Sequence, residues 1–437
     1  MCEVSKTVKD VVNKLRNNPV FYMSLGSKEL FHSNMLAWLL ESCDSDDNLL
    51  SEIAKALAKL FMPKQDSENG YKVLTVLREK NHFDLIIVFL PKDDYDSINN
   101  EDLLEIKDLF LNYKQPSNIE LLKKLQNDFR FAVVENKFKS IPNKEQLDKY
   151  NNIIKNRICF IDVKEPQEDK KRRNTLFSIV LNEENTTRYL MAPKLVLDNF
   201  AELLECPWLP VRYEDIRDVL LRSKIDTDNF TATFINHYAN FLKNMLQLTE
   251  DIETNLEQRD NHAFPNQKDI RELSKIRIHD FYEKLWFNVL LNKIQISEEK
   301  VPKKNKGIDY SNTWGILNFN FINTAEDLVY GVQIQQGQFR LFVYPNKHKW
   351  KNDEYLPKTI KDYFSEIWKM MGKETEVCKT RTKDGLCNYG NFKYQYIKIY
   401  NKITIAELTE MIKSAVDAIC DYNKTDLEKL RQYLDSK

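Results

Sequence analysis

Three charged residues border two apolar segments in a pattern suited to acid–base or metal chemistry. The segment FAVVENKFKS, residues 131–140, is apolar at first and then places Glu135 and Lys137 two positions apart. The segment HFDLIIVFL, residues 82–90, places Asp84 in front of a strongly apolar run. Side chains two positions apart on a β-strand point to the same face, so a strand here would present Glu135 and Lys137 together.

We expect the segments 84–90 and 131–137 to pair as antiparallel strands, which brings the start of one beside the end of the other. Asp84 then lies beside Glu135 and Lys137. Two carboxylates at one place need a divalent cation to offset their repulsion, and hard oxygen ligands suit magnesium. A lysine at that place can hold or activate a water for in-line attack on a phosphodiester, while the metal stabilises the developing charge.

The same residues have a simpler interpretation, as the solvated polar end of a strand. An acid and a lysine at this spacing occur by chance in any charged chain. Asp84 and the later helical segment that contains Gln146 and Tyr150 favour the catalytic interpretation.

Other polar residues near these segments have structural interpretations. Asn136 points away from its two neighbours on a strand, so its side chain is predicted to be structural. His32 follows apolar residues on a predicted helix and is as well explained by a hydrogen-bonded core histidine as by a site residue. Tyr150 could serve packing alone.

The elements that must position these residues follow from apolar periodicity. Residues 71–91 form two strand-like runs around a polar turn at Lys80–Asn81, which predicts a hairpin. Residues 92–128 are acidic and polar with two short helical patterns, and we interpret them as an insertion. Further strands are predicted over 157–163 and 176–182, and helices over 5–17, 27–42, 48–61, 143–156, 212–223 and 230–248.

The second half of the chain has its own alternation of helices and strands. The polar stretch 249–269 is the best candidate for a domain boundary, which predicts domains over 1–250 and 260–437. Beyond it we expect a helix over 278–294, strands over 314–322 and 328–345 with a hairpin turn at Gln335–Gln338, and terminal helices. Tyr394, Tyr396 and Tyr400 alternate with Lys393 and Lys398, either as a base-stacking surface or as an ordinary amphipathic edge strand.

Composition excludes several classes of protein. The 437 residues are 42% hydrophobic, which argues against a globally disordered chain. The 65 basic and 66 acidic residues nearly cancel, so a polyanion must be met by a local patch. No window approaches 18 uninterrupted apolar residues and the first residues lack an apolar signal core, so a cytoplasmic protein without membrane contact is expected. The cysteines are scattered, without the CxxC spacing of a zinc knuckle.

Taken in order, the motifs resemble the PD-(D/E)XK nuclease superfamily, whose core is that of restriction endonucleases. The resemblance rests on Asp84 followed by the Glu135-Asn136-Lys137 motif, and it covers roughly residues 27–165. The other segments that carry it are ELFHSNMLAWLLES (29–42), LREKNHFDLIIV (77–88) and ENKFKSIPNKEQLDKY (135–150). The gap between Asp84 and Glu135 is longer than the hairpin usual in this family, which requires residues 92–128 to fold outward.

The resemblance implies a set of metal ligands. Asp84 and Glu135 would bind the ion with their carboxylates, and the backbone carbonyl of Asn136 would be a third ligand. Glu29, on the first of the matching helices, would reach the metal directly or through water. The ion would be Mg²⁺ or Mn²⁺.

The resemblance also implies catalytic roles. Lys137 would orient or deprotonate the attacking water, and Gln146 would position that water or the scissile phosphate. Glu79 and Tyr150 are supporting candidates. The expected fold is an α/β restriction-endonuclease-like core, a central mixed sheet flanked by helices, with a C-terminal α+β domain.

The function implied is a metal-dependent nuclease, acting on DNA rather than RNA, in bacterial restriction or anti-phage defence. One alternative is a non-cleaving nucleic-acid-binding or regulatory protein on a nuclease scaffold. Another is a protein whose C-terminal domain binds a partner or a second copy of the chain and gates the nuclease.

Overall fold

The computed structural model divides the chain into two compact units, which are described separately. The first unit is residues 13–247, and the second is residues 1–12 with 248–437. The structure describes residues 5–24, 29–62, 70–138, 142, 144–164, 175–199, 207–222, 230–257, 262–294, 317–323, 328–335, 337–345, 355–379, 382, 385–399 and 403–422.

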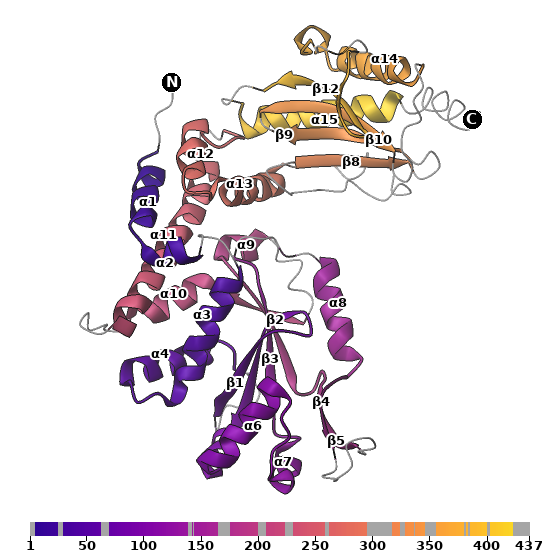
Figure 1. Ribbon diagram of the computed structural model, residues 1–437. Coiled ribbons are helices and arrows are strands. Elements are labelled where there is room, and N and C mark those ends of the chain that lie inside the picture. The colour runs from indigo at the N-terminus through magenta and orange to yellow at the C-terminus, as the bar shows by residue number, and fades with distance from the viewer. Residues whose placement is uncertain are drawn as a thin grey trace. The chain divides into compact units, whose positions relative to one another are not determined.

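The first unit is built on a mixed five-stranded sheet in the order β1-β2-β3-β6-β7 (Figure 1). The first three strands pair antiparallel, and β3–β6 and β6–β7 pair parallel. The predicted restriction-endonuclease-like fold, a central mixed sheet flanked by helices, is confirmed. The strands are β1 (Tyr71–Lys80), β2 (Phe83–Pro91), β3 (Arg130–Asn136), β6 (Thr186–Ala192) and β7 (Trp208–Arg212).

The antiparallel pairing predicted for β2 and β3 is confirmed. Its register joins Leu85 to Val134 and Phe89 to Arg130. Residues 85–90 of β2 are all buried, which explains why this strand is a continuous apolar run instead of an alternating one.

A tight turn leads from β1 into β2. Lys80 pairs with Phe83, so the hairpin turn is Asn81–His82, one residue later than predicted. Both turn residues have positive φ, 52° and 73°, which is the backbone of a type I′ turn. The turn places Asp84 directly after the start of β2.

Helices flank this sheet. From the N-terminal side these are α1 (Lys6–Arg16), which crosses the boundary between the units, α2 (Pro19–Ser24), α3 (Glu29–Glu41) and α4 (Asn48–Ala58), with a 3-10 turn at Ser42–Asp44. Helix α3 packs on β1 and β2. The later ones are α8 (Lys144–Lys155), α9 (Lys194–Asn199), α10 (Tyr213–Arg222) and α11 (Phe230–Glu257).

Residues 92–128 form a helical excursion between β2 and β3, with three helices where two were predicted. They are α5 (Lys92–Ser97), α6 (Asn100–Asn112) and α7 (Ile119–Leu125). Asn99 and Asn118 cap α6 and α7 by accepting backbone hydrogen bonds. Because β2 and β3 still pair directly, the excursion lengthens the gap from Asp84 to Glu135 without separating the two strands. A separate hairpin is formed by β4 (Ile158–Lys164) and β5 (Thr175–Leu181).

The second unit holds an antiparallel sheet in the order β11-β12-β10-β9-β8. Its strands are β8 (Leu317–Asn323), β9 (Leu328–Gln335), β10 (Gln338–Pro345), β11 (Cys387–Tyr389) and β12 (Phe392–Lys398). Its helices are α12 (Gln267–Ser274), α13 (His279–Lys293), α14 (Tyr355–Met370) and α15 (Ile405–Tyr422), with a 3-10 turn at Glu374–Glu376.

One face of this second sheet is covered by α14, through the ring contacts of Phe339 with Trp368 and of Tyr330 with Tyr363. Helix α11 continues to Glu257, so the polar stretch 249–269 begins as helix. Residues 314–316 and Tyr400 lie outside the described residues. Among the described helices, none has both the length and the apolar character needed to cross a membrane.

Candidate active site

The carboxylates of Asp84 and Glu135 come from neighbouring strands. The register that joins Leu85 to Val134, continued by one residue, sets Asp84 opposite Glu135. Directly opposed residues of an antiparallel pair project from the same face. The backbone N–H of Asn136 donates to Oδ2 of Asp84 at 2.7 Å and holds that side chain against the end of β3.

Glu135 is the most enclosed of the charged groups, at 1% exposure. Its Oε1 accepts from Nζ of Lys137 at 2.7 Å and from Nε2 of Gln146 at 2.7 Å. Its Oε2 is buried without a hydrogen-bond partner among the residues that the structure describes. Burial raises the pKa of Glu135 to about 7, with Asp84 and Glu29 adding to the shift and Lys137 opposing it.

Lys137 is a buried cation. Burial is the largest influence and by itself would favour the neutral form, but the carboxylates of Glu135, Glu29 and Asp84 together outweigh it and raise the lysine pKa above its usual value. A lysine that holds its proton is suited to binding a water or stabilising negative charge. It is poorly suited to removing a proton.

Helix α8 contributes Gln146 to the site. Nε2 of Gln146 donates to Glu135 and also to the hydroxyl of Tyr150 at 2.8 Å. The ring of Tyr150 packs on Phe83 and Trp208. Tyr150 therefore anchors Gln146. The same side chain packs in the core through its ring and supports the site through its hydroxyl.

Asn136 faces the other side of the sheet, as its place in the strand predicted. Its Nδ2 donates to the backbone carbonyl of Glu29 at 2.9 Å and to Oγ of Ser33 at 3.1 Å. Its Oδ1 accepts from the hydroxyl of Tyr213 at 2.7 Å. This fully buried side chain thus ties β3 to α3 and α10, one residue away from the carboxylates.

Two further acids act on the site through their charge. Burial raises the pKa of Asp84, while its hydrogen bond from Asn136 and the charge of Lys137 oppose the shift and Glu29 and Glu79 add to it. Glu79 has a φ of 52° on β1, a strained backbone for this residue type. Within the described part of the chain, no three Asp, Glu, His or Cys side chains form a ready metal cluster. The place of Glu29 among the ligands therefore stays a prediction.

His32 belongs to the core of the first unit. It is fully buried, its Nδ1 lies 3.1 Å from the hydroxyl of Tyr238, and its ring stacks on Phe241. Of the two interpretations of His32, the structure favours the core histidine.

Tyr213 and Ser33 support the site but were not predicted as site residues, although Ser33 belongs to the segment 29–42 that carries the family resemblance. Tyr213 lies 77 residues after Asn136 and in a different element. Ser33 stands one helical turn after Glu29, and its Oγ donates to the carbonyl of that residue.

The donor set suits a hard divalent cation. Asp84 and Glu135 offer carboxylate oxygens, the ligand type that Mg²⁺ and Mn²⁺ prefer. The buried Oε2 of Glu135, without a described partner, is oriented for a further electropositive group. Three acids, Asp84, Glu135 and Glu29, act on the buried cation of Lys137.

The fold defines a restriction-endonuclease-like protein with acids and a lysine at the end of two central strands. A family model described as the PD-(D/E)XK nuclease superfamily matches residues 19–240, just over half of the 437 residues. The chain belongs to this superfamily, and the resemblance inferred from its motifs is confirmed. Comparisons with curated proteins and with solved structures gave no match.

A first prediction concerns the Asn136 bonds. Asn136→Ala should lower the free energy of unfolding by about 1–3 kcal/mol, because partners on α3 and α10 are left unpaired in the core. Tyr213→Phe removes one of the same bonds from the other side. In urea titrations the two changes should therefore be non-additive, with a coupling of about 0.5–3 kcal/mol. Asn112→Ala, on the exposed side of α6, is the control, and strictly additive effects would contradict the contact.

A second prediction concerns the pH dependence of stability. Because the folded pKa of Glu135 is raised from 4.5 to about 7, its contribution is fully present below pH 4.5 and is lost as the pH rises through 7. Glu135→Gln removes this loss. In EDTA, the free energy of unfolding of Glu135→Gln relative to that of the wild type should therefore rise between pH 4.5 and 8, by about 1.4 kcal/mol for each unit of the pKa shift. Melting temperatures measured across this pH range check the direction.

Divalent cations should make the wild type more stable than Glu135→Gln at pH 8, the opposite of the order expected in EDTA. Mg²⁺ or Mn²⁺ at pH 8 should stabilise the wild type and leave Glu135→Gln nearly unchanged, because binding to the folded state shifts its stability by mass action. Glu52→Gln, on the exposed face of α4, controls for loss of a surface charge. A flat pH profile for the Glu135→Gln difference would contradict the buried, ionisable carboxylate.

Proposed function

We propose that this protein is a metal-dependent nuclease that hydrolyses phosphodiester bonds in DNA, with Mg²⁺ or Mn²⁺ as its cofactor. The observation that carries the proposal is the contact of Glu135 with Lys137 and Gln146, next to Asp84, at the end of β2 and β3. The superfamily of the chain supports a nucleic acid as substrate. A restriction-endonuclease-like core favours DNA, and a role in bacterial restriction or anti-phage defence belongs to the same proposal.

The proposed ligands are the carboxylates of Asp84 and Glu135 and the backbone carbonyl of Asn136, with Glu29 reaching the ion from α3. When bound, the cation supplies charge stabilisation to the phosphoryl oxygens. The remaining chemistry belongs to side chains of the site.

Lys137 holds the attacking water or stabilises negative charge with its protonated amine, in accordance with its raised pKa. Gln146 donates to Glu135 and fixes the orientation of that carboxylate. Its second bond, to Tyr150, keeps the amide from rotating. These contacts support a preorganised site, in which few groups must move before the reaction.

We propose further that the second unit recognises the nucleic acid or a partner. Arg340 on β10 is 8% exposed, and its guanidinium donates to the side chains of Gln333, Gln335 and Gln338 at 2.5–2.8 Å. It lies 4.6 Å from the ring centroid of Tyr394 and forms no salt bridge with a described carboxylate.

Aromatic rings continue this face of the sheet, opposite the face that α14 covers. Phe342 stacks on Phe392 at 4.9 Å and on Tyr344 at 5.9 Å, and Tyr394 contacts Tyr396. Strand β12 lies between β10 and the three-residue β11, which pairs only with residues 392–394, so residues 395–398 lie at the edge of the sheet and 392–394 do not. An arginine with amides and stacked rings is a combination that binds unpaired bases. A protein partner or a second copy of the chain on this unit is the competing occupant.

The catalytic proposal makes a third prediction. Lys137→Met keeps the length of the side chain and removes its charge, so cleavage of plasmid DNA with Mg²⁺ should fall by about 10²–10⁴-fold. Lys137→Arg should not restore the rate, because a planar guanidinium does not fit the place of a buried ammonium. Glu135→Ala should abolish both cleavage and stabilisation by the metal.

The controls for this series are Lys149→Met, an exposed lysine of α8, and thermal melting of every variant. Assays with linear DNA, single-stranded DNA and RNA, each with Mg²⁺, Mn²⁺ or EDTA, define the substrate. If a folded Lys137→Met variant cleaved DNA at the wild-type rate, Lys137 would have no catalytic role, and Glu135 and Lys137 would be only the polar end of a strand.

A fourth prediction tests the recognition role. Arg340→Met and Tyr394→Leu should each weaken binding of a single-stranded oligonucleotide, measured by fluorescence anisotropy in EDTA, by about 1–3 kcal/mol. Lys413→Met on α15 should leave it unchanged. Unchanged binding by both variants of the Arg340 face would assign the face to a protein contact instead.

A further inference from the structure

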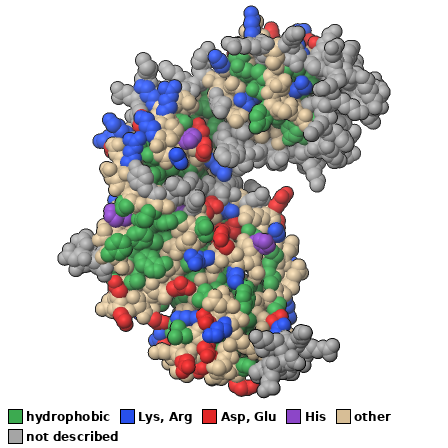
Figure 2. All heavy atoms as spheres, in the orientation of Figure 1, with side chains coloured by type: hydrophobic (Ala, Val, Ile, Leu, Met, Phe, Trp, Pro, Cys, Tyr) green, Lys and Arg blue, Asp and Glu red, His purple; other side chains and the backbone are tan. Residues whose placement is uncertain are grey.

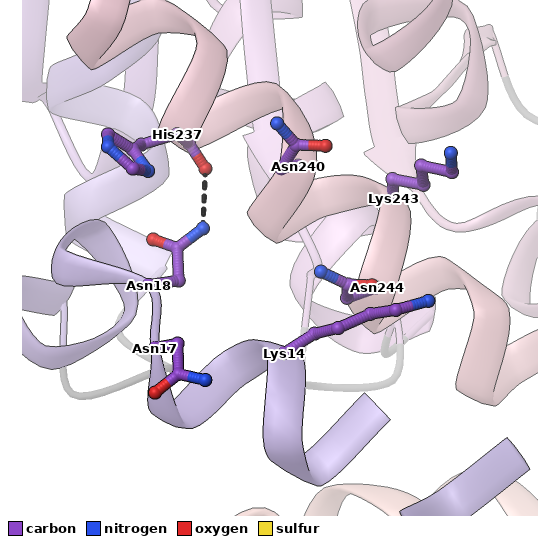
Figure 3. A pocket seen from close by; sticks show the side chains of 7 residues that line it. All are labelled: Lys14, Asn17, Asn18, His237, Asn240, Lys243 and Asn244. Carbon is purple, nitrogen blue, oxygen red and sulfur yellow. Dashed lines mark hydrogen bonds between the residues drawn. The ribbon is translucent and has the colours of Figure 1, made fainter. Parts of the chain in front are cut away.

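A polar pocket of about 350 Å³ lies in the first unit, apart from the residues of the candidate active site. Figure 3 shows it between the α1–α2 junction and α11. Lys14, Asn17, Asn18, His237, Asn240, Lys243 and Asn244 line it. The lining contains two lysines, a histidine and four asparagines, and neither a carboxylate nor a large hydrophobic side chain.

Helical spacing explains how α11 builds its side of the pocket. His237, Asn240 and Asn244 recur at three- and four-residue intervals and so share one face of the helix. The adjacent face carries Tyr238 and Phe241, which pack in the core. The hydroxyl of Tyr238 bonds to His32 of α3, so the helix that lines the pocket also supports the helix that begins at Glu29.

The wall contributed by the α1–α2 junction is rigidly held. Nδ2 of Asn18 donates to the backbone carbonyl of His237 at 2.8 Å, the dashed line in Figure 3. Its Oδ1 accepts from the backbone N–H groups of Val20 and Phe21 at 2.9 and 3.2 Å. Both polar atoms of the Asn18 side chain are thereby bound within the protein, and Asn18 fixes the wall of the pocket.

Asn244 is the neighbour with unused capacity. It is 6% exposed, lines the pocket, and makes no hydrogen bond with any residue that the structure describes. Its amide atoms are not among the buried polar atoms that lack a partner, so they reach solvent through the pocket and are available to donate to a ligand there.

The rim of the pocket is positively charged. Lys14 and Lys243 are exposed, and neither forms a salt bridge with a described carboxylate. In Figure 3 the side chain of Lys14 extends from α1 toward Asn244. Figure 2 shows Lys and Arg side chains gathered at the upper left of the visible face, and basic and acidic side chains mixed over its lower part.

We propose that this pocket binds a phosphate group. Ammonium groups at the rim and amide donors match an anion with several acceptor oxygens, and no described Phe, Tyr or Trp ring lines the pocket for a base to stack on. The phosphate can belong to the backbone of a polynucleotide, held away from the scissile bond, or to a free nucleotide. The polynucleotide source rests on the proposed nuclease function, whereas the phosphate chemistry does not.

The test is binding in EDTA, so that cleavage plays no part. Fluorescence anisotropy with a labelled 20-base-pair duplex, as a function of salt, measures the polynucleotide source. Lys14→Ala/Lys243→Ala should weaken binding of the duplex at least about tenfold and reduce the salt slope of log K by about one, because the contact with one phosphate is lost. Lys123→Ala/Lys124→Ala on α7 removes the same charge from another exposed site and should change neither quantity.

Titration calorimetry with AMP, ATP and inorganic phosphate measures the free-nucleotide source. Nucleotide binding that disappears in Lys14→Ala/Lys243→Ala, with duplex affinity retained, would assign the pocket to a free phosphate. Asn244→Asp keeps the shape of the side chain and repels an anion, so it should weaken whichever ligand binds, while Asn112→Asp should not.

The two proposals can fail separately. A protein whose pocket variants lose phosphate binding, yet which cleaves nothing with Mg²⁺ or Mn²⁺, would keep this inference and overturn the nuclease function. A protein that cleaves DNA, and whose folded pocket variants bind duplex, nucleotides and phosphate as the wild type does, would overturn the inference alone. Melting curves of each variant establish that it is folded.

Discussion

The pairing of β2 with β3 is the constraint on which the candidate site depends. A shift of this register by one residue would turn every side chain of β3 to the other face and separate Asp84 from Glu135. The register is held because residues 85–90 are buried on both faces, so a slip would also disturb the core. The N–H of Asn136, donating to Asp84, adds a contact at the point where the carboxylates emerge.

Side chains alternate between the two faces of the sheet along β3, so three consecutive residues have different roles. Glu135 and Lys137 face Gln146 on α8, whereas Asn136 faces α3 and α10. The stabilising hydrogen bonds on one face thus oppose the unfavourable concentration of buried acids on the other. Burial, with the charges of Asp84 and Glu29 adding to it, raises the pKa of Glu135 to about 7, so a divalent cation here would affect stability as well as chemistry.

A chain with balanced total charge can still bind a polyanion through local groups. The pocket between the α1–α2 junction and α11 combines Lys14, Lys243 and an unpartnered Asn244. The sheet of the second unit presents Arg340 beside glutamines and Tyr394. The cationic side chains of both groups lack a described carboxylate partner. Such local positive charge is not apparent from the net charge of the chain.

The sequence by itself determined the features that depend on local spacing. The two-residue period of a strand put Glu135 and Lys137 on one face and Asn136 on the other, and apolar runs located β2, β3 and the hairpin before Asp84. Tertiary structure alone decided which residues distant in the sequence contact these elements. Tyr213 reaches Asn136 across 77 residues, and Asn18 meets His237 across 219. Folding likewise decided that Lys137 keeps its proton, because the acids that it brings near raise the lysine pKa against the opposing effect of burial.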